Sequence, residues 1–192
     1  MLIDQTSGNE SDLVQQAQQG NRSAYGELIQ RHYDGVVRVV YRMCGEAQTA
    51  EDATQEAFIR AWIKLPAYQP RAPFRNWLYR IAVNAALDIL RKKPEENLED
   101  EGVMMFADPT PDPETTLIEK EQAAFLQKAV KALPEAARLV LVLREYGELS
   151  YQEIASVLEI PIGTVMSRLN YARRCLRQTL QQVQFEAENE HA

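Results

Sequence analysis

The chain has 192 residues, 45% of them hydrophobic, and a formal net charge of −7. This length and composition are typical of a folded protein with one ordinary domain or two small ones. No apolar run is long enough to cross a membrane, and the polar N-terminus does not resemble a secretory signal, so we expect a cytoplasmic protein. The two cysteines and two histidines lack the spacing of a metal site, and no catalytic motif is present. We therefore expect no metal, no cofactor, no small-molecule substrate and no enzymatic activity.

Charge is distributed unevenly along the chain. Residues 71–93 contain six basic residues and one acidic residue, and residues 164–180 contain four basic residues and no acidic one. Between these blocks, residues 95–121 contain ten acidic residues and one basic residue. The acidic total argues against nonspecific nucleic-acid binding by the whole surface, whereas the asymmetry favours two DNA-facing patches joined by a solvated linker.

Apolar residues recur at intervals of three and four between Tyr25 and Tyr41. This spacing predicts one long helix with a wide apolar face, which we expect to stop at Gly45. His32 lies within that face, so we expect it to be partly buried and to use one ring nitrogen for a hydrogen bond.

Two further helices are expected in the N-terminal half of the chain. The first should begin at Thr49, where the sequence T-A-E-D resembles a capping box, and should end at Pro66. The second should run from about Pro73 to Lys93. No alternation of β-branched residues predicts a strand, so the expected fold is all-α.

Two small helical domains are expected, at residues 1–93 and 119–182. Residues 94–118, with four prolines and a dense acidic run, should form a flexible linker between them. The apolar residues Val103–Phe106 either dock on a domain or form one apolar patch in a disordered stretch. Residues 183–192 are expected to form an acidic tail.

A helix-turn-helix is predicted in the C-terminal domain. Ser150 is a suitable N-cap with Glu153 at the capping-box position, and Pro161 and Gly163 predict a turn, with Gly163 free to take a positive φ. Thr164 should cap the second helix. The expected buried stripe of that helix consists of Val165, Leu169, Ala172, Leu176 and Leu180. Its acid-free face, which we expect to contact phosphates and base edges, consists of Thr164, Ser167, Arg168, Tyr171 and Arg174.

The helix predicted at residues 74–93 combines basic and aromatic side chains. Arg80, Asn84 and Arg91 share a polar face, and Trp77 stands at its border. Arginines neutralise phosphates and aromatic rings stack on unpaired bases, so this pattern favours contact with single-stranded nucleic acid. The nearby aromatic residues Tyr68, Phe74 and Tyr79 suit the same role, but Phe74 and Tyr79 are at least as well explained as core residues.

Both segments resemble a known family. Residues 133–177 resemble the fourth conserved domain of bacterial sigma factors, and residues 52–62 and 74–91 resemble the second domain of the extracytoplasmic-function group. The resemblance implies a factor that binds core RNA polymerase and promoter DNA, and that helps to open the minus-ten element without catalysing a reaction. It also implies contacts with the β′ coiled coil and the β flap, and regulation by an anti-sigma protein, which in that family is often membrane-bound.

The resemblance assigns residues to three surfaces. Core polymerase binding maps to Asp52, Gln55, Glu56, Phe58 and Ile59. Recognition of the minus-ten element, with capture of an unpaired base by the loop before residue 74, maps to Arg60, Tyr68, Phe74, Arg75, Trp77, Arg80, Asn84 and Arg91. Recognition of the minus-thirty-five element maps to Arg144, Thr164, Ser167, Arg168, Asn170, Tyr171 and Arg174.

The sequence departs from the family at two positions of the helix-turn-helix. Met166 stands where the family commonly has lysine or arginine, and Glu159 stands where it often has glycine. A methionine cannot pair with a phosphate as a basic residue does, so we expect Asn170 and Tyr171 to take over part of that role in binding DNA.

Two other functions are compatible with the pattern. A response-regulator type of transcriptional regulator shares this helix-turn-helix, but it would carry a sensor or ligand domain in the N-terminal half, where no such signature is present. An RNA-binding or purely structural helical protein is disfavoured by the acidic total charge.

Overall fold

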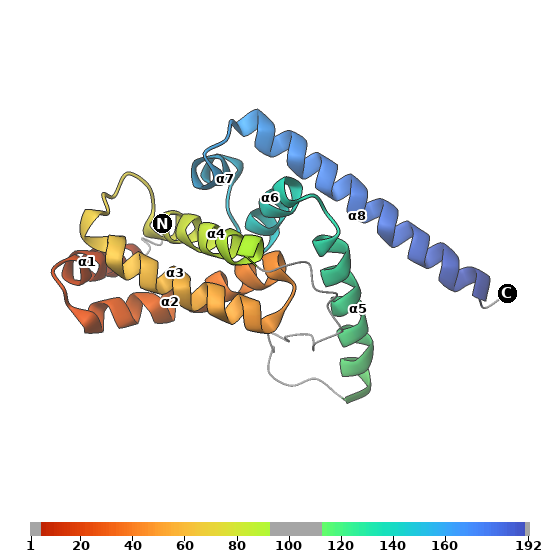
Figure 1. Ribbon diagram of the computed structural model, residues 1–192, viewed down its shortest axis with the longest axis horizontal. Helices are drawn as coiled ribbons and strands as arrows, with labels where there is room; N and C mark the ends of the chain where they lie inside the picture. The colour runs from red at the N-terminus through yellow and green to blue at the C-terminus, as the bar shows by residue number, and fades with distance from the viewer. Residues whose placement is uncertain (1–4, 93–112, 191–192) are drawn as a thin grey trace.

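The computed structural model describes the backbone of residues 5–92 and 113–190, and the side chains of residues 10–92 and 122–181. Within these ranges all regular structure is helical, which confirms the predicted fold class (Figure 1). None of the described helices is long and apolar enough to cross a membrane. The elements are α1 Gln5–Gln18, α2 Arg22–Cys44, α3 Ala47–Lys64, the 3-10 helix η1 Leu65–Ala67, α4 Phe74–Lys92, α5 Pro113–Lys131, α6 Glu135–Glu145, α7 Tyr151–Leu158 and α8 Ile162–Glu190.

The long helix predicted around Tyr25–Tyr41 is α2. Asn21 caps its start, because the Asn21 side chain accepts hydrogen bonds from the backbone N–H groups of Ser23 and Ala24. The helix stops at Gly45, as predicted, where φ is 82° and the left-handed backbone favours glycine. The turn after Gly45 leads directly into α3.

The start of α3 differs from the prediction. The helix begins at Ala47, after Glu46, and Thr49 lies inside its first turn rather than at the cap. The buried Thr49 hydroxyl donates to the Glu46 carboxylate at 2.5 Å, so this hydroxyl has its hydrogen-bond partner three residues earlier in the chain. The T-A-E-D sequence that begins at Thr49 resembles a capping box, but α3 begins two residues before it.

Small side chains explain how α3 packs between its neighbours. Ala50, Ala53, Ala57 and Ala61 are all fully buried along one face of the helix. Because alanine extends only a methyl group, α2 and α4 both approach α3 closely. Helix α4 therefore packs against both α2 and α3.

The helix-turn-helix is formed by α7 and α8. The Ser150 hydroxyl accepts from the Glu153 N–H at 3.3 Å and the Glu153 carboxylate accepts from the Ser150 N–H at 2.8 Å, which confirms the predicted capping box. The expectation for Gly163 and Thr164 was wrong. The positive φ falls at Glu159, with a value of 53°, and α8 has begun by Ile162, so Gly163 and Thr164 lie in its first turn.

Two predicted boundaries also shift. Helix α5 begins at Pro113, within the expected linker, and α8 continues as helix through the expected acidic tail as far as Glu190. In Figure 1, α8 is the long blue helix that projects beyond the rest of the molecule. The Val103–Phe106 segment lies outside the described residues.

The two halves of the chain pack together. Helix α7 contacts α4, and α2 contacts both α5 and α6. Gln127 of α5 is buried in this contact, where its amide nitrogen lies 3.4 Å from the carbonyl oxygens of Tyr41 and Arg42. One hydrophobic cluster therefore runs through both predicted domains.

Candidate nucleic-acid and polymerase interfaces

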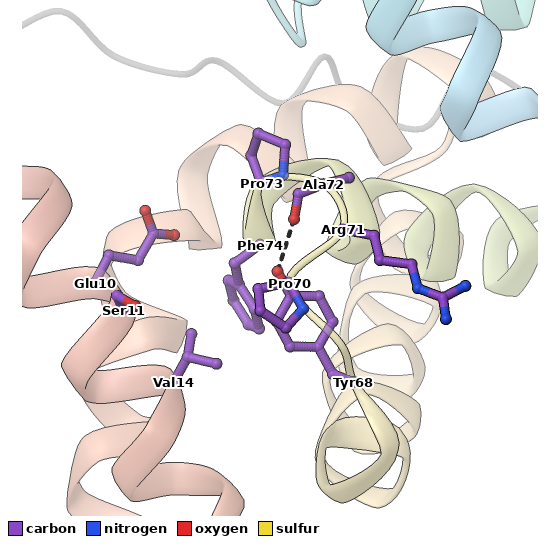
Figure 2. A pocket seen from close by; sticks show the side chains of 9 residues that line it. All are labelled: Glu10, Ser11, Val14, Tyr68, Pro70, Arg71, Ala72, Pro73 and Phe74. Atoms are coloured by element: carbon purple, nitrogen blue, oxygen red, sulfur yellow. Dashed lines mark hydrogen bonds between the residues drawn. The ribbon is translucent and has the colours of Figure 1, made fainter.

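A cavity of about 400 Å³ lies between α1 and the loop of residues 68–73 (Figure 2). Its walls include the aromatic rings of Tyr68 and Phe74 and the pyrrolidine rings of Pro70 and Pro73. The Tyr68 hydroxyl donates to the Ala72 carbonyl oxygen at 2.8 Å, which closes the loop on itself. This hydrogen bond holds the loop in one shape, and the loop forms a wall of the cavity directly before the N-terminus of α4.

The aromatic side chains around this cavity form one cluster. The Trp77 ring lies 4.9 Å from the Tyr68 ring and 5.4 Å from the Phe74 ring, measured between centroids. Tyr68 and Phe74 are only 8% and 5% exposed, whereas Trp77 is partly exposed. Tyr79 is buried, and burial raises the pKa of its hydroxyl. Phe74 and Tyr79 are therefore core residues, and Trp77 keeps the larger exposed ring surface.

The basic face of α4 is partly covered by α7. Arg80 is exposed, and its Nη2 lies 2.6 Å from Oε1 of Glu159. Asn76, a buried residue that the sequence did not single out, donates from Nδ2 to Oε1 of Glu153 at 3.1 Å, and Nη2 of Arg75 lies 3.6 Å from the same oxygen. Carboxylates of the helix-turn-helix thus occupy positions beside the groups expected to face DNA.

The Glu153 carboxylate remains ionised in this setting. Burial opposes its charge, but the hydrogen bonds from Ser150 and Asn76 and the charge of Arg75 outweigh burial and lower the pKa of Glu153. Asn84 and Arg91 of the same α4 face are exposed, and Arg91 approaches Glu135 only to 3.9 Å.

Arg60 of α3 is held between two carboxylates. Its Nη1 donates to Asp88 at 2.6 Å and its Nε donates to Glu56 at 2.7 Å. The hydrogen bond from Arg60 is the main reason that the pKa of Asp88 is lowered. Arg60 therefore ties α3 to the polar face of α4.

The surface expected to bind polymerase lies on α3. Asp52, Gln55 and Ile59 are exposed and Glu56 is partly exposed, so these four form the predicted stripe. Phe58 does not belong to it. Its side chain is 8% exposed and stacks on Tyr33 at 6.1 Å, so it supports the stripe from beneath.

Ile63 extends this surface by one turn, although the sequence did not single it out. It is 69% exposed, and Ile59 is 56% exposed, so the two side chains give α3 an apolar end. The sequence could have indicated Ile63, because residues four apart lie on the same face of a helix and Ile63 follows Ile59 by four.

The outer face of α8 carries the residues predicted to read DNA. Ser167, Asn170, Tyr171 and Arg174 are exposed, and Thr164 and Arg168 are partly exposed. The Arg174 guanidinium lies 5.5 Å from the centre of the Tyr171 ring. Exposed Met166 adjoins this face.

One prediction for α8 needs correction. Leu180 is 44% exposed rather than buried, because α8 continues past the helices that cover its earlier turns.

Arg144 is partly exposed and also has partners within the fold. Its Nη1 donates to the Leu149 carbonyl oxygen at 2.8 Å, and its guanidinium lies over the Tyr151 ring. Arg144 therefore fixes the turn that precedes α7, a role the sequence did not indicate.

A groove of about 650 Å³ lies between α5, α6 and α8. Leucine and valine side chains from its helices line it, together with Arg177 and with Arg173, whose Nη2 donates to Oε1 of Glu145 at 2.8 Å. The exposed Leu180 belongs to this groove, so it offers an apolar surface beside charged side chains of both signs.

Comparison with known families matches both halves of the chain. The family model Sigma-70 region 2 matches residues 28–95, and the model Sigma-70, region 4 matches residues 126–176. The class defined by the capped helix-turn-helix and the basic aromatic helix is therefore that of the sigma-70 factors.

Individual relatives narrow this class. The chain is 35% identical over 176 residues to the ECF RNA polymerase sigma factor SigW of Bacillus subtilis, which covers 87% of the chain and 94% of that relative. It is 33% identical over 191 residues to the RNA polymerase sigma-H factor of Pseudomonas aeruginosa, covering 95% of the chain and 99% of that relative. The chain belongs to the extracytoplasmic-function group of RNA polymerase sigma factors. The alternative of a response-regulator type of regulator is not favoured.

Solved structures show the same fold. The structure of CnrH in complex with the cytosolic domain of CnrY superposes with a TM-score of 0.70 at 26% identity, covering 91% of this chain and 98% of that one. The sigma factor RpoE of Bartonella quintana, solved with the anti-sigma factor NepR, superposes with a TM-score of 0.67 at 19% identity, covering 82% of this chain and 96% of that one.

Proposed function

We propose that this sigma factor holds promoter DNA at two points, the minus-ten element at α4 and its adjoining cavity, and the minus-thirty-five element at α8. The observation that carries the proposal is the position of the aromatic cavity directly before the basic face of α4. The polymerase performs the chemistry, in the cytoplasm, and this chain supplies promoter choice and strand opening.

At the minus-ten element, the cavity accepts a base that has left the DNA stack. Stacking on an aromatic side chain contributes roughly 1–3 kcal/mol per base and tolerates any base. Tyr68 and Phe74 shape the cavity, while the partly exposed Trp77 stacks on a neighbouring base. Arg75, Arg80 and Arg91 neutralise phosphates, and Asn84 pairs with a base edge.

At the minus-thirty-five element, α8 enters the major groove with the face that runs from Thr164 to Arg174. Arg168 and Arg174 supply guanidinium donors, while Ser167 and Asn170 supply shorter polar groups. Arg144 acts by holding the turn before α7 in place, and Arg60 acts by holding Asp88.

Core polymerase binds the exposed stripe of α3. An amphipathic partner helix, such as those of the β′ coiled coil, can pack on the apolar side chains of Ile59 and Ile63 and pair with the polar groups of Asp52, Gln55 and Glu56. The apolar groove between α5, α6 and α8 suits a second contact, with the β flap.

Promoter binding requires α4 and α7 to separate. Arg75, Asn76 and Arg80 are engaged by Glu153 and Glu159, so the basic face of α4 is released for DNA only when that contact opens. We also infer that an anti-sigma protein, soluble or membrane-bound, holds this chain inactive, as the resemblance to the extracytoplasmic-function group implies. In keeping with a protein partner of this kind, CnrH, which is 26% identical to this chain, was solved in complex with the cytosolic domain of CnrY.

The test uses purified components. The chain is mixed with core polymerase and a library of duplexes with randomised promoter sequence, and transcripts are sequenced. We expect transcripts to come from a small subset of sequences that share two conserved blocks. Binding to duplex DNA without any transcription would refute the proposal. The comparison variant is Glu56→Arg, which should reduce the selected transcripts because it weakens association with core polymerase.

A further inference from the structure

One wall of the cavity comes from α1 rather than from the loop or α4. Glu10, Ser11 and Val14 form this wall. Figure 2 shows Glu10 and Val14 projecting from α1 toward Phe74 and the loop that carries Pro70, whereas the Arg71 guanidinium points away from this space. The charged side chain directed toward the cavity is therefore the Glu10 carboxylate. A negative charge is unexpected at a surface proposed to bind DNA.

The Glu10 carboxylate is fixed in position by His32. Nε2 of His32 donates to Oε1 of Glu10 at 2.8 Å, and the His32 ring packs 5.5 Å from the Phe74 ring. This hydrogen bond is the main cause that lowers the pKa of Glu10, against the effect of its partial burial. A charged carboxylate is only an acceptor, and Glu10 retains a second oxygen for another donor.

The other polar side chains directed at the cavity offer little discrimination between bases. The Tyr68 hydroxyl is committed to the Ala72 carbonyl oxygen, and Pro70 and Pro73 have no backbone N–H. Aromatic and proline rings accept the flat face of any base. The Ser11 hydroxyl can both donate and accept, so it does not distinguish an amino group from a carbonyl.

We propose that Glu10 selects the extruded base, by accepting a hydrogen bond from an exocyclic amino group and thereby disfavouring thymine. Adenine, cytosine and guanine each carry such a group, whereas thymine offers one N–H flanked by two carbonyl oxygens that the carboxylate repels. His32 is the positioning residue that holds the carboxylate toward the base. This inference rests on the proposed capture of an unpaired base at the cavity.

The first experiment compares promoter selection by three proteins with the same core polymerase and the same randomised library. The wild type should disfavour thymine at one position of the minus-ten block, by about fivefold to a hundredfold. Glu10→Gln should tolerate thymine at that position alone, because the amide N–H₂ can donate to a carbonyl oxygen. Asp12→Asn removes the same charge from an exposed position of α1 outside the cavity wall and should keep the wild-type preference.

The second experiment uses wild-type protein only, so it does not depend on how a variant folds. At the selected position, adenine is replaced by purine, or cytosine by 2-pyrimidinone, each of which lacks the exocyclic amino group. Open-complex formation should fall about fivefold or more with either analogue. Each replacement is made in the best promoter carrying that base, so the two together compare the amino groups of adenine and cytosine at this position.

Two results would overturn the inference. One is a base preference for Glu10→Gln that matches the wild type at every position, and the other is full activity of promoters carrying the analogues. Failure of the wild type to direct any transcription would instead refute the proposed function itself, so the two failures are distinguishable.

Discussion

Arg80 of α4 and Glu159, the residue that caps the C-terminus of α7, form an ion pair that joins the two halves of the chain, with 2.6 Å between Nη2 and Oε1. Both side chains are largely exposed, so the pair itself contributes little stability, about 0–1 kcal/mol. Glu159 also takes a left-handed backbone conformation, with φ of 53°, that favours glycine. Local stability therefore does not explain a glutamate at this position, whereas its contact with Arg80 places it at the surface proposed to bind the minus-ten strand.

We predict that Glu159→Gly increases the affinity of the full chain for single-stranded minus-ten DNA, because Arg80 is freed. The gain should be a fewfold at low salt and should shrink as salt rises, since exposed charges are screened. Fluorescence anisotropy with a labelled oligonucleotide measures this. The unfolding free energy should stay the same or rise, because glycine relieves the backbone conformation. Equal affinities of the two proteins at low salt would count against this account of Glu159.

We predict that Glu56→Arg weakens association with core polymerase by tenfold or more. The substitution reverses a charge in the middle of the α3 stripe and places a cation beside Arg60. Affinity is measured by titrating labelled sigma factor with core. Glu27→Arg on α2 makes the same charge change in a glutamate that also pairs with an arginine four residues away, and it should leave affinity unchanged. Equal effects of the two substitutions would mean that α3 is not the polymerase surface.

We predict that Asn84→Ala slows promoter opening while core affinity stays within twofold of the wild type. Asn84 is exposed on the polar face of α4, so its removal leaves the fold intact. Opening is followed with a fluorescent base analogue in the minus-ten element. Trp77→Ala should have a larger effect on opening, because it removes a stacking ring worth roughly 1–3 kcal/mol. Parallel losses of core binding and opening would show that both residues are only structural.

We predict opposite stability effects at two glycines. Gly45→Ala should lower the unfolding free energy by about 1–2 kcal/mol, because φ is 82° and a Cβ there would lie 3.0 Å from Cδ of Lys131. Gly163→Ala should raise it by up to about 1 kcal/mol, because alanine favours a helix and the added Cβ meets nothing within 4 Å. Chemical denaturation of the full chain measures both. Destabilisation by Gly163→Ala would contradict the helical backbone at Gly163 in the first turn of α8.

Local signals allowed five of the described helices, α2, α3, α4, α7 and α8, and two caps to be predicted, whereas α1, α5 and α6 were not predicted. The Ser150–Glu153 capping box and the Gly45 stop each depend on neighbouring residues alone, and both are confirmed. The prediction for the turn before α8 was wrong because Glu159 takes the left-handed conformation that glycine usually takes, which left Gly163 free to enter the helix. The prediction for Thr49 was wrong because two residues before it already have helical geometry.

The candidate sites were harder to predict from the sequence than the helices. The stripe of Asp52, Gln55, Glu56 and Ile59 follows from helical spacing, but spacing does not show that Phe58 packs against Tyr33 from a different helix. The contribution of Glu10 to the cavity depends on how α1 packs beside a loop about sixty residues later in the chain. Long-range packing of this kind has no local pattern to reveal it.

The central claim, a grip on promoter DNA at two points, is tested most directly by changing the distance between the two promoter blocks. Transcription by core polymerase with this chain is measured from a selected promoter and from variants with five base pairs, about half a helical turn, added or removed between the blocks. We predict a loss of tenfold or more in both variants, and no transcription without the chain. Transcription that is indifferent to the spacing, or that persists when either block is scrambled, would contradict the account.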